Sequence, residues 1–283
     1  MFGRTGLIAA ALLVFGGAVA SAQTEPDAAL ASLATDAASA AVATPAPAAP
    51  RTISTTYDAS WSGLSALHIS VALRLTGDAF VATASLKPAG LTTITSHLRK
   101  STTYVAQSRG MLKEPGVALP GHYSHHGGKK NRQVDINFTP RDVTVTANPI
   151  FGSMGDPPAS AAQRLEAVDS LSAIVSLITT APDKTCTRDL KVFDGRARYN
   201  LDLTPAGTEK IKVDGFKGTA TKCTIDYQRV AGFEKKKDEK PLLEKPLTIW
   251  FAPTANGLMA PAKISVDSNW GPITVTLKSL SVS

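Results

Sequence analysis

The fold is decided by the stretch Cys186-Thr-Arg-Asp-Leu-Lys-Val-Phe-Asp-Gly-Arg-Ala-Arg-Tyr-Asn-Leu-Asp-Leu203. Two strand-like runs in it, Leu190–Phe193 and Ala197–Leu203, flank the dipeptide Asp194-Gly195. Such a dipeptide favours a tight turn because both residues accept positive φ. The stretch therefore predicts a β-hairpin. The second cysteine, Cys223, opens a further strand-like segment that ends at Phe233.

The first 22 residues resemble a secretory signal. Arg4 provides the positive charge, Leu7–Val14 the apolar region, and Ala20-Ser-Ala22 a small-residue cleavage site. The apolar region is too short to span a bilayer, and no later stretch is long enough. We therefore expect an exported, periplasmic protein that is soluble after signal cleavage and does not span a membrane.

Cys186 and Cys223 are the only two cysteines, and export would place them in an oxidising compartment. In an oxidising compartment two cysteines most simply form one disulfide. The alternative is a redox or metal pair, but the sequence has no Cys-x-x-Cys and no histidine nearby. A disulfide between Cys186 and Cys223 is the prediction.

Residues 23–50 consist almost wholly of Ala, Thr, Ser, Asp and Pro. Such a segment has few large apolar side chains to bury, so ordering it would cost more entropy than it regains. We expect a disordered linker here and a single β-rich domain over residues 51–283.

Within this domain, clusters of β-forming residues alternate with turn residues, which is typical of strands. From His68 to Leu75 every second residue is apolar, so one face of that strand should be buried. Residues 114–131 contain several glycines and prolines and predict a long irregular crossing. Short connections between strands predict a mainly β fold, a curved antiparallel meander.

One helix is predicted. Asp169 is a suitable N-cap, and Leu171, Ile174, Val175 and Ile178 follow at helical spacing. The spacing predicts a helix over residues 170–179 with one buried stripe, packed on the sheet. A short helix covers only part of a large sheet, so we also expect an apolar concavity between the two.

The chain resembles the DUF3108 family of exported bacterial proteins of unknown function. The resemblance spans nearly the whole domain and is carried by these residues: Tyr57-Asp-Ala-Ser-Trp-Ser-Gly63, Leu119-Pro-Gly-His-Tyr123, Asp169-Ser-Leu-Ser-Ala173, Cys186, Val192-Phe-Asp-Gly-Arg196, Arg198-Tyr199, Cys223, Gly232-Phe233, Ile249-Trp-Phe251 and Pro261. Ser170 stands where the pattern often has proline. The resemblance implies a strand order similar to LolA/LolB-like envelope proteins, that is, an open barrel or β-spiral around a cavity partly filled by helix. It implies no activity.

Several residue groups could carry chemistry. His122, His125 and His126 could contribute to a transition-metal site, but the segment lacks a carboxylate or cysteine and contains Lys129 and Lys130, so we expect no metal. The sequence contains no Gly-x-Ser-x-Gly nucleophile motif and indicates no cofactor. Asp189, Asp194 and Asp202 could supply the paired carboxylates of a glycosidase.

The candidate binding residues are Arg196, Arg198, Tyr199 and Trp250. If Arg196 and Arg198 lie on one strand they share a face and could bind a carboxylate or phosphate. Alternatively they pair with Asp189 and Asp202 across the hairpin. The aromatic side chains in this half of the chain are either core residues or part of a ligand site.

The net charge of +7 is modest, and the basic clusters at residues 129–132 and 235–237 lack interleaved aromatics, so we expect no nucleic-acid partner. Two classes of function remain. The favoured one is a non-enzymatic envelope protein that binds or scaffolds an apolar or amphiphilic ligand, a lipid or an envelope protein partner. The alternative is a periplasmic hydrolase acting on cell-wall or lipid material with acidic residues of the 189–202 hairpin.

Overall fold

The computed structural model describes residues 49–90, 103–128, 131–234, 246–268 and 271–283. The predicted signal and nearly all of the predicted linker lie outside these residues, as do the basic clusters at 129–130 and 235–237. The described chain forms thirteen strands: β1 Arg51–Trp61, β2 Leu64–Thr76, β3 Ala79–Pro88, β4 Tyr104–Glu114, β5 Val117–Gly127, β6 Arg132–Phe138, β7 Val143–Asn148, β8 Arg188–Phe193, β9 Arg198–Val213, β10 Phe216–Ala231, β11 Leu247–Pro253, β12 Met259–Ser268 and β13 Gly271–Val282.

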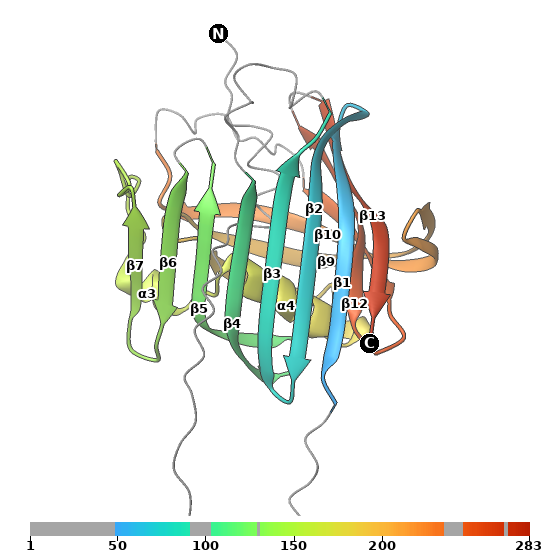
Figure 1. The fold of residues 1–283 in the computed structure, drawn as a ribbon, viewed down its shortest axis with the longest axis horizontal. Coiled ribbons are helices and arrows are strands. Elements are labelled where there is room, and N and C mark those ends of the chain that lie inside the picture. The colour runs from blue at the N-terminus through green and yellow to red at the C-terminus, as the bar shows by residue number, and fades with distance from the viewer. Residues whose placement is uncertain (1–48, 91–102, 129–130, 235–245, 269–270) are drawn as a thin grey trace, which may run out of the picture.

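All thirteen strands belong to one antiparallel sheet with the order β7-β6-β5-β4-β3-β2-β1-β13-β12-β11-β10-β9-β8. Neighbours in the sheet are neighbours in sequence except at the centre, where β1 pairs with β13. The two ends of the order, β7 and β8, do not pair with each other, so the sheet is open. Figure 1 shows β1–β7 side by side in front and β9 and β10 crossing behind them. The predicted curved antiparallel meander is confirmed.

The inner face of the sheet is set by period-two alternation. In β2 the side chains of Ile69, Val71, Leu73 and Leu75 are buried and those between them are exposed, as the sequence predicts. The inner positions of all the strands merge into one hydrophobic core.

The predicted crossing at residues 114–131 is wrong, because residues 117–127 form β5. Gly116 has φ +84° and makes the turn between β4 and β5. Pro120 lies beside a register shift in the pairing with β4, where a missing N–H is tolerated. Glycine and proline therefore mark a tight hairpin and an irregular strand here rather than a loop.

The predicted hairpin is present, since β8 and β9 pair antiparallel around Asp194-Gly195. Gly195 has φ +97°, and the Asp194 carboxylate accepts hydrogen bonds from the backbone N–H groups of Arg196 and Ala197. However, the strand expected to end at Leu203 continues to Val213. Residues 204–213 are exposed over most of their length. Their sequence therefore lacks the alternation of apolar and polar residues that would have predicted a strand.

Two short helices are present in the described chain, α3 Ala161–Leu165 and α4 Ser170–Thr179. Asp169 caps α4 by accepting from the N–H groups of Leu171 and Ser172 at 2.9 Å each, as predicted. All ten residues of α4 are buried, so the single buried stripe is wrong. The helix contacts β3, β4 and β5 on one side and β8 and β12 on another. Strands distant in sequence therefore cover the face that was expected to be open.

The polar residues of α4 bond to the sheet. The hydroxyls of Ser176 and Thr179 accept hydrogen bonds from the backbone N–H groups of Ala118 in β5 and of Gly116 in the turn before it. These bonds satisfy strand donors and helix hydroxyls together, which removes the cost of burying either group alone. The space around α4, where an apolar concavity was expected, is therefore filled by the buried side chains of the helix.

The segment that contains α3 bridges the two free edges of the sheet. Arg164 donates from Nη1 to the carbonyl of Val143 in β7 at 3.2 Å. Val168 exchanges backbone hydrogen bonds with Lys191 and Phe193 of β8, both 2.9 Å. Covering edge strands in this way prevents their pairing with another chain.

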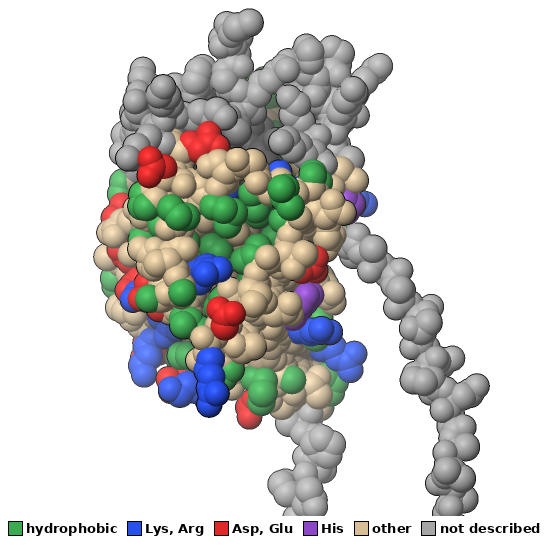
Figure 2. Space-filling model, turned by 90° about the vertical axis from the view of Figure 1, so that its left-hand side faces the viewer, with side chains coloured by type: hydrophobic (Ala, Val, Ile, Leu, Met, Phe, Trp, Pro, Cys, Tyr) green, Lys and Arg blue, Asp and Glu red, His purple; other side chains and the backbone are tan. Residues whose placement is uncertain are grey.

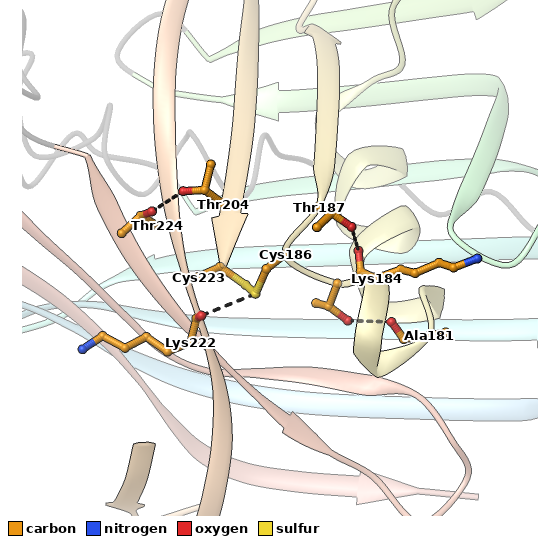
Figure 3. The surroundings of a disulfide bond; sticks show 9 residues. Ala181, Lys184, Cys186, Thr187, Thr204, Lys222, Cys223 and Thr224 are labelled. Atoms are coloured by element: carbon orange, nitrogen blue, oxygen red, sulfur yellow. Dashed lines mark hydrogen bonds between the residues drawn. A yellow bond between two sulfur atoms is a disulfide. The ribbon is translucent and has the colours of Figure 1, made fainter. Parts of the chain in front are cut away.

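The predicted disulfide is confirmed, since Cys186 and Cys223 are bonded with their Cα atoms 5.3 Å apart. Cys186 lies between the 3₁₀ turn Pro182–Lys184 and β8, and Cys223 lies on β10 (Figure 3). The bond thus holds the segment leaving α4 against the inner face of the sheet. In the chain-entropy model, closing this loop of about forty residues contributes about 4 kcal/mol.

Candidate functional site

Arg198, at the start of β9, is a buried structural residue with 1% exposure. Its guanidinium donates to the carbonyl of Gln163 (3.1 Å), to the carbonyl of Tyr199 (2.7 Å) and to Asn200 Oδ1 (2.7 Å). It also forms an ion pair with Glu166 at 3.0 Å. Lys191 and Arg198 together lower the pKa of Glu166, with Lys191 the larger cause. These bonds attach the α3 segment to the sheet and occupy every guanidinium nitrogen.

Arg196 lies in the turn that connects β8 and β9, so it does not share a strand face with Arg198. Its Nη2 pairs with Glu234 at 3.1 Å. The alternative pairing with Asp189 and Asp202 is also wrong, because Arg196 pairs with Glu234 and Arg198 pairs with Glu166.

Tyr199 and Trp250 are buried at separate places. The Tyr199 hydroxyl lies 3.4 Å from Ser170 Oγ, and its ring lies 5.2 Å from that of Tyr227. Tyr199 pairs across the sheet with Arg229 and Trp250 pairs with Lys222, both on β10. These two β10 positions are seven residues apart, which is about 23 Å along a strand. The structure therefore does not bring Trp250 to the arginine residues.

Trp250 is covered by charged side chains rather than by a ligand. The ammonium groups of Lys222 and Lys263 lie 5.2 and 4.7 Å from the centre of the indole ring, and the indole N–H donates to Glu209 at 3.1 Å. Long lysine stems can bury an aromatic ring while their charged ends stay in water. This arrangement leaves Trp250 only 6% exposed.

The acidic residues of the hairpin do not form a separated catalytic pair. Asp189 and Asp202 lie directly opposite each other on β8 and β9. Burial raises the pKa of Asp202, and a hydrogen bond between the two carboxyl groups raises it further. Glycosidase carboxyls stand at least about 5 Å apart to admit the scissile bond. Asp194 is buried within the turn, where its carboxylate serves as a backbone cap.

The three histidines lie on β5 and do not converge. His125 faces inward with Ala106, whereas His122 lies beside Asp135, with 3.6 Å between His122 Nε2 and the carboxylate. His125 Nδ1 is buried without a hydrogen-bond partner. Burial lowers the pKa of His125 to about 4, aided by Arg132 and His126. Within the described ranges, no group of three metal-ligating side chains is assembled.

The outer face of β3–β5 carries an apolar patch that the sequence analysis missed. Val81, Met111 and Leu119 are 41%, 57% and 50% exposed. Met111 pairs with Ala79 on one side and with Leu119 on the other, so these residues form one row across three strands. Val81 lies one row further along β3, between Arg74 and Arg109. We name Val81, Met111 and Leu119 the outer patch.

The signal for the outer patch was present in the sequence. Ala79-Phe-Val-Ala82 is apolar without alternation, so one strand must place apolar side chains on both faces of the sheet. Of the other exposed large hydrophobic residues, Leu64 begins β2, and Ile150, Met154 and Leu165 belong to the segment that follows β7. Figure 2 views the molecule from the β7 side and shows hydrophobic side chains dispersed among polar and charged ones on that face.

A family model described as "Protein of unknown function (DUF3108)" matches residues 56–278. The chain belongs to the DUF3108 family. The match begins within β1, ends within β13 and confirms the resemblance stated from the motifs. No protein of curated function matches the chain in sequence.

The solved structures that are similar to this DUF3108 chain include the following two. One is the β-barrel-like protein of domain of unknown function DUF1849 from Brucella abortus, with 11% identity, a TM-score of 0.44, and 83% of this chain and 98% of that chain covered. The other is named "putative lipoprotein" and comes from Parabacteroides distasonis ATCC 8503, with 11% identity, a TM-score of 0.30, and coverage of 81% and 94%. Because both TM-scores are below 0.5, we assign the fold from the sheet topology of the chain itself.

Proposed function

We propose that this DUF3108 chain is a non-enzymatic protein of the bacterial envelope that binds or scaffolds a partner through its outer surface. The observation that carries the proposal is the contrast between the two faces of the sheet. Around α4 the inner face is occupied by a helix with no exposed residue, whereas the outer face of β3–β5 presents the outer patch. Contiguous exposed apolar side chains on a folded domain are typical of contact surfaces.

Export to the periplasm is part of the proposal. The signal-like residues 1–22 support it, and so does the Cys186–Cys223 disulfide, because such bonds persist in oxidising compartments. No helix in the described part of the chain is long and apolar enough to cross a bilayer. Arg196, Arg198, Tyr199 and Trp250 then act by holding the sheet together and not by binding a ligand.

The hydrolase alternative is supported less well. Its acidic residues are either in contact with each other, as Asp189 and Asp202 are, or buried as a turn cap, as Asp194 is. Neither arrangement leaves a site where a substrate bond could lie between an acid and a base.

Retention of the protein by membranes isolated from its own envelope tests the proposal. The doubly substituted variant Met111→Ser/Leu119→Ser should lose most of the retention of the parent protein. Ile150→Ser, which removes an 80% exposed apolar side chain elsewhere, is the matched control and should be retained fully. Equal retention of all three proteins would refute the proposal.

A further inference from the structure

We propose that the outer patch docks on the surface of a lipid bilayer that contains anionic lipids. This inference rests on the proposed function and names its partner. It is carried by the charge around the patch, which the pairing of β3 with β2 and β4 places on the same face.

The outer patch is flanked by cations on the same face of the sheet. Val81 pairs with Arg74 on β2 and with Arg109 on β4, and directly opposed residues point to the same side. Both arginines are exposed, and neither forms an ion pair with a described residue. Lys113 is exposed two positions beyond Met111 on β4.

Acidic residues are absent from these two rows. The row through Val81 reads Arg74, Val81, Arg109, His122 from β2 to β5, and the row through Met111 reads Thr76, Ala79, Met111, Leu119. The nearest carboxylates along these strands, Asp78 and Glu114, lie at or beside the hairpin turns. A third carboxylate, that of Asp135 on β6, lies 3.6 Å from His122 Nε2 at the far end of the Val81 row. The centre of the surface is therefore apolar and cationic.

This combination fits a bilayer surface better than a protein partner. A stable protein interface buries on the order of 1,000 Å² or more with a continuous apolar centre, whereas three aliphatic side chains on the outside of a curved sheet offer much less. Apolar side chains that enter the boundary of the acyl chains, with arginine or lysine at headgroup level, are the pattern of interfacial membrane binding. Figure 1 shows β3, β4 and β5 side by side in front of α4, with no helix or strand of the described residues lying over their outer face in that view.

Sedimentation of the purified protein with vesicles tests the inference. Vesicles of phosphatidylcholine mixed with phosphatidylglycerol should retain the parent protein, and vesicles of phosphatidylcholine alone should not. Each cation near an anionic surface strengthens binding roughly fivefold. Arg74→Gln/Arg109→Gln should therefore weaken binding by roughly 25-fold. Salt of about 1 M should release the parent protein, because it shortens the screening length to about 3 Å.

The controls separate this inference from the proposed function. Met111→Ser/Leu119→Ser should lose vesicle binding while Ile150→Ser retains it, and all variants should keep the melting temperature of the parent because the changes are on exposed side chains. If envelope membranes retain the parent through the patch but anionic vesicles do not, the partner is a protein and the lipid inference is wrong. If neither depends on the patch, both proposals fail. Dimerisation lost in the Met111→Ser/Leu119→Ser variant, without vesicle binding, would identify a second copy as the partner.

Discussion

The Ser108 hydroxyl on β4 donates a 2.9 Å hydrogen bond to the Asp169 carboxylate that caps α4. Both groups are fully buried, and the other carboxylate oxygen accepts from the N–H groups of Leu171 and Ser172 in the first turn of the helix. One side chain thus caps the central helix and fixes its start against the sheet.

Replacement of Asp169 by alanine should lower the free energy of unfolding by about 2–4 kcal/mol. The loss of the cap accounts for about 1 kcal/mol. The hydroxyls of Ser108 and Ser172 both donate to the carboxylate and lie 3.0 Å apart, so one of these buried donors is left without an acceptor, which accounts for about 1–3 kcal/mol. Urea unfolding at neutral pH measures it. Asp169→Asn is the matched control, because its amide oxygen can still cap the helix. An alanine variant as stable as the asparagine variant would contradict the assignment.

The stability difference between the parent protein and Asp169→Asn should depend on pH. Burial raises the pKa of Asp169 despite the hydrogen bonds from Ser172, Ser108 and Leu171 that lower it. The folded state therefore binds this proton more tightly than the unfolded state, whose pKa is about 3.9. The stability of the parent relative to Asp169→Asn should fall as pH rises from about 4 to the raised pKa, and stay constant above it. A difference that grows with pH in this range would show that the sign is wrong.

Reduction of the disulfide should destabilise the fold by about 4 kcal/mol. The described residues contain no free cysteine, so a reductant acts on this bond alone. Thermal unfolding with and without dithiothreitol measures the loss. Cys186→Ala/Cys223→Ala should reproduce it and should not respond to the reductant. A parent protein whose melting temperature ignores the reductant would contradict a stabilising role.

Features with a local cause could be predicted from the sequence. The alternation in β2, the turn at Asp194-Gly195 and the cap at Asp169 each depend on residues within a few positions. The disulfide followed from the presence of only two cysteines in a chain that begins with a signal-like segment.

Features set by distant contacts could not be predicted. The partner of Arg198 is Glu166, 32 residues upstream, and no periodicity connects them. α4 is buried on all sides because β8 and β12 return over it, and helical spacing alone shows only one apolar stripe. β5 was missed for a different reason, because glycines and prolines that accommodate its turn and its irregular pairing have the composition of a loop.

Gly195→Ala should be more destabilising than Gly207→Ala. Both glycines have positive φ, +97° and +85°, so alanine pays a similar backbone cost at each. A Cβ on Gly195 would lie 2.8 Å from Val134 Cγ1 in β6, whereas a Cβ on Gly207 would meet nothing within 4 Å. The extra loss at Gly195 measures how closely the hairpin tip packs on β6, and we expect about 1–3 kcal/mol from overpacking. Equal melting temperatures for the two variants would show that the tip is not packed there.

The parent protein should lose stability on mild acidification because of His125, and His125→Phe should abolish this loss. The His125 ring contacts Tyr104 and Tyr123, with ring centres 5.9 and 5.6 Å away, and phenylalanine can keep both contacts. Burial lowers the pKa of His125 to about 4, so the folded state binds the proton less tightly than the unfolded state, with its pKa near 6.5. The free energy of unfolding should therefore decrease as pH falls from about 6.5 to about 4, by at most about 3 kcal/mol.

This decrease should be absent in His125→Phe and present in the control His68→Gln, which alters an exposed histidine on β2. At neutral pH the phenylalanine variant should be at least as stable as the parent, because it removes a buried nitrogen that has no hydrogen-bond partner. Chemical unfolding at closely spaced pH values measures both effects. A phenylalanine variant that keeps the full acid sensitivity of the parent would show that another group is responsible, and Asp169 cannot be that group because its raised pKa acts in the opposite direction.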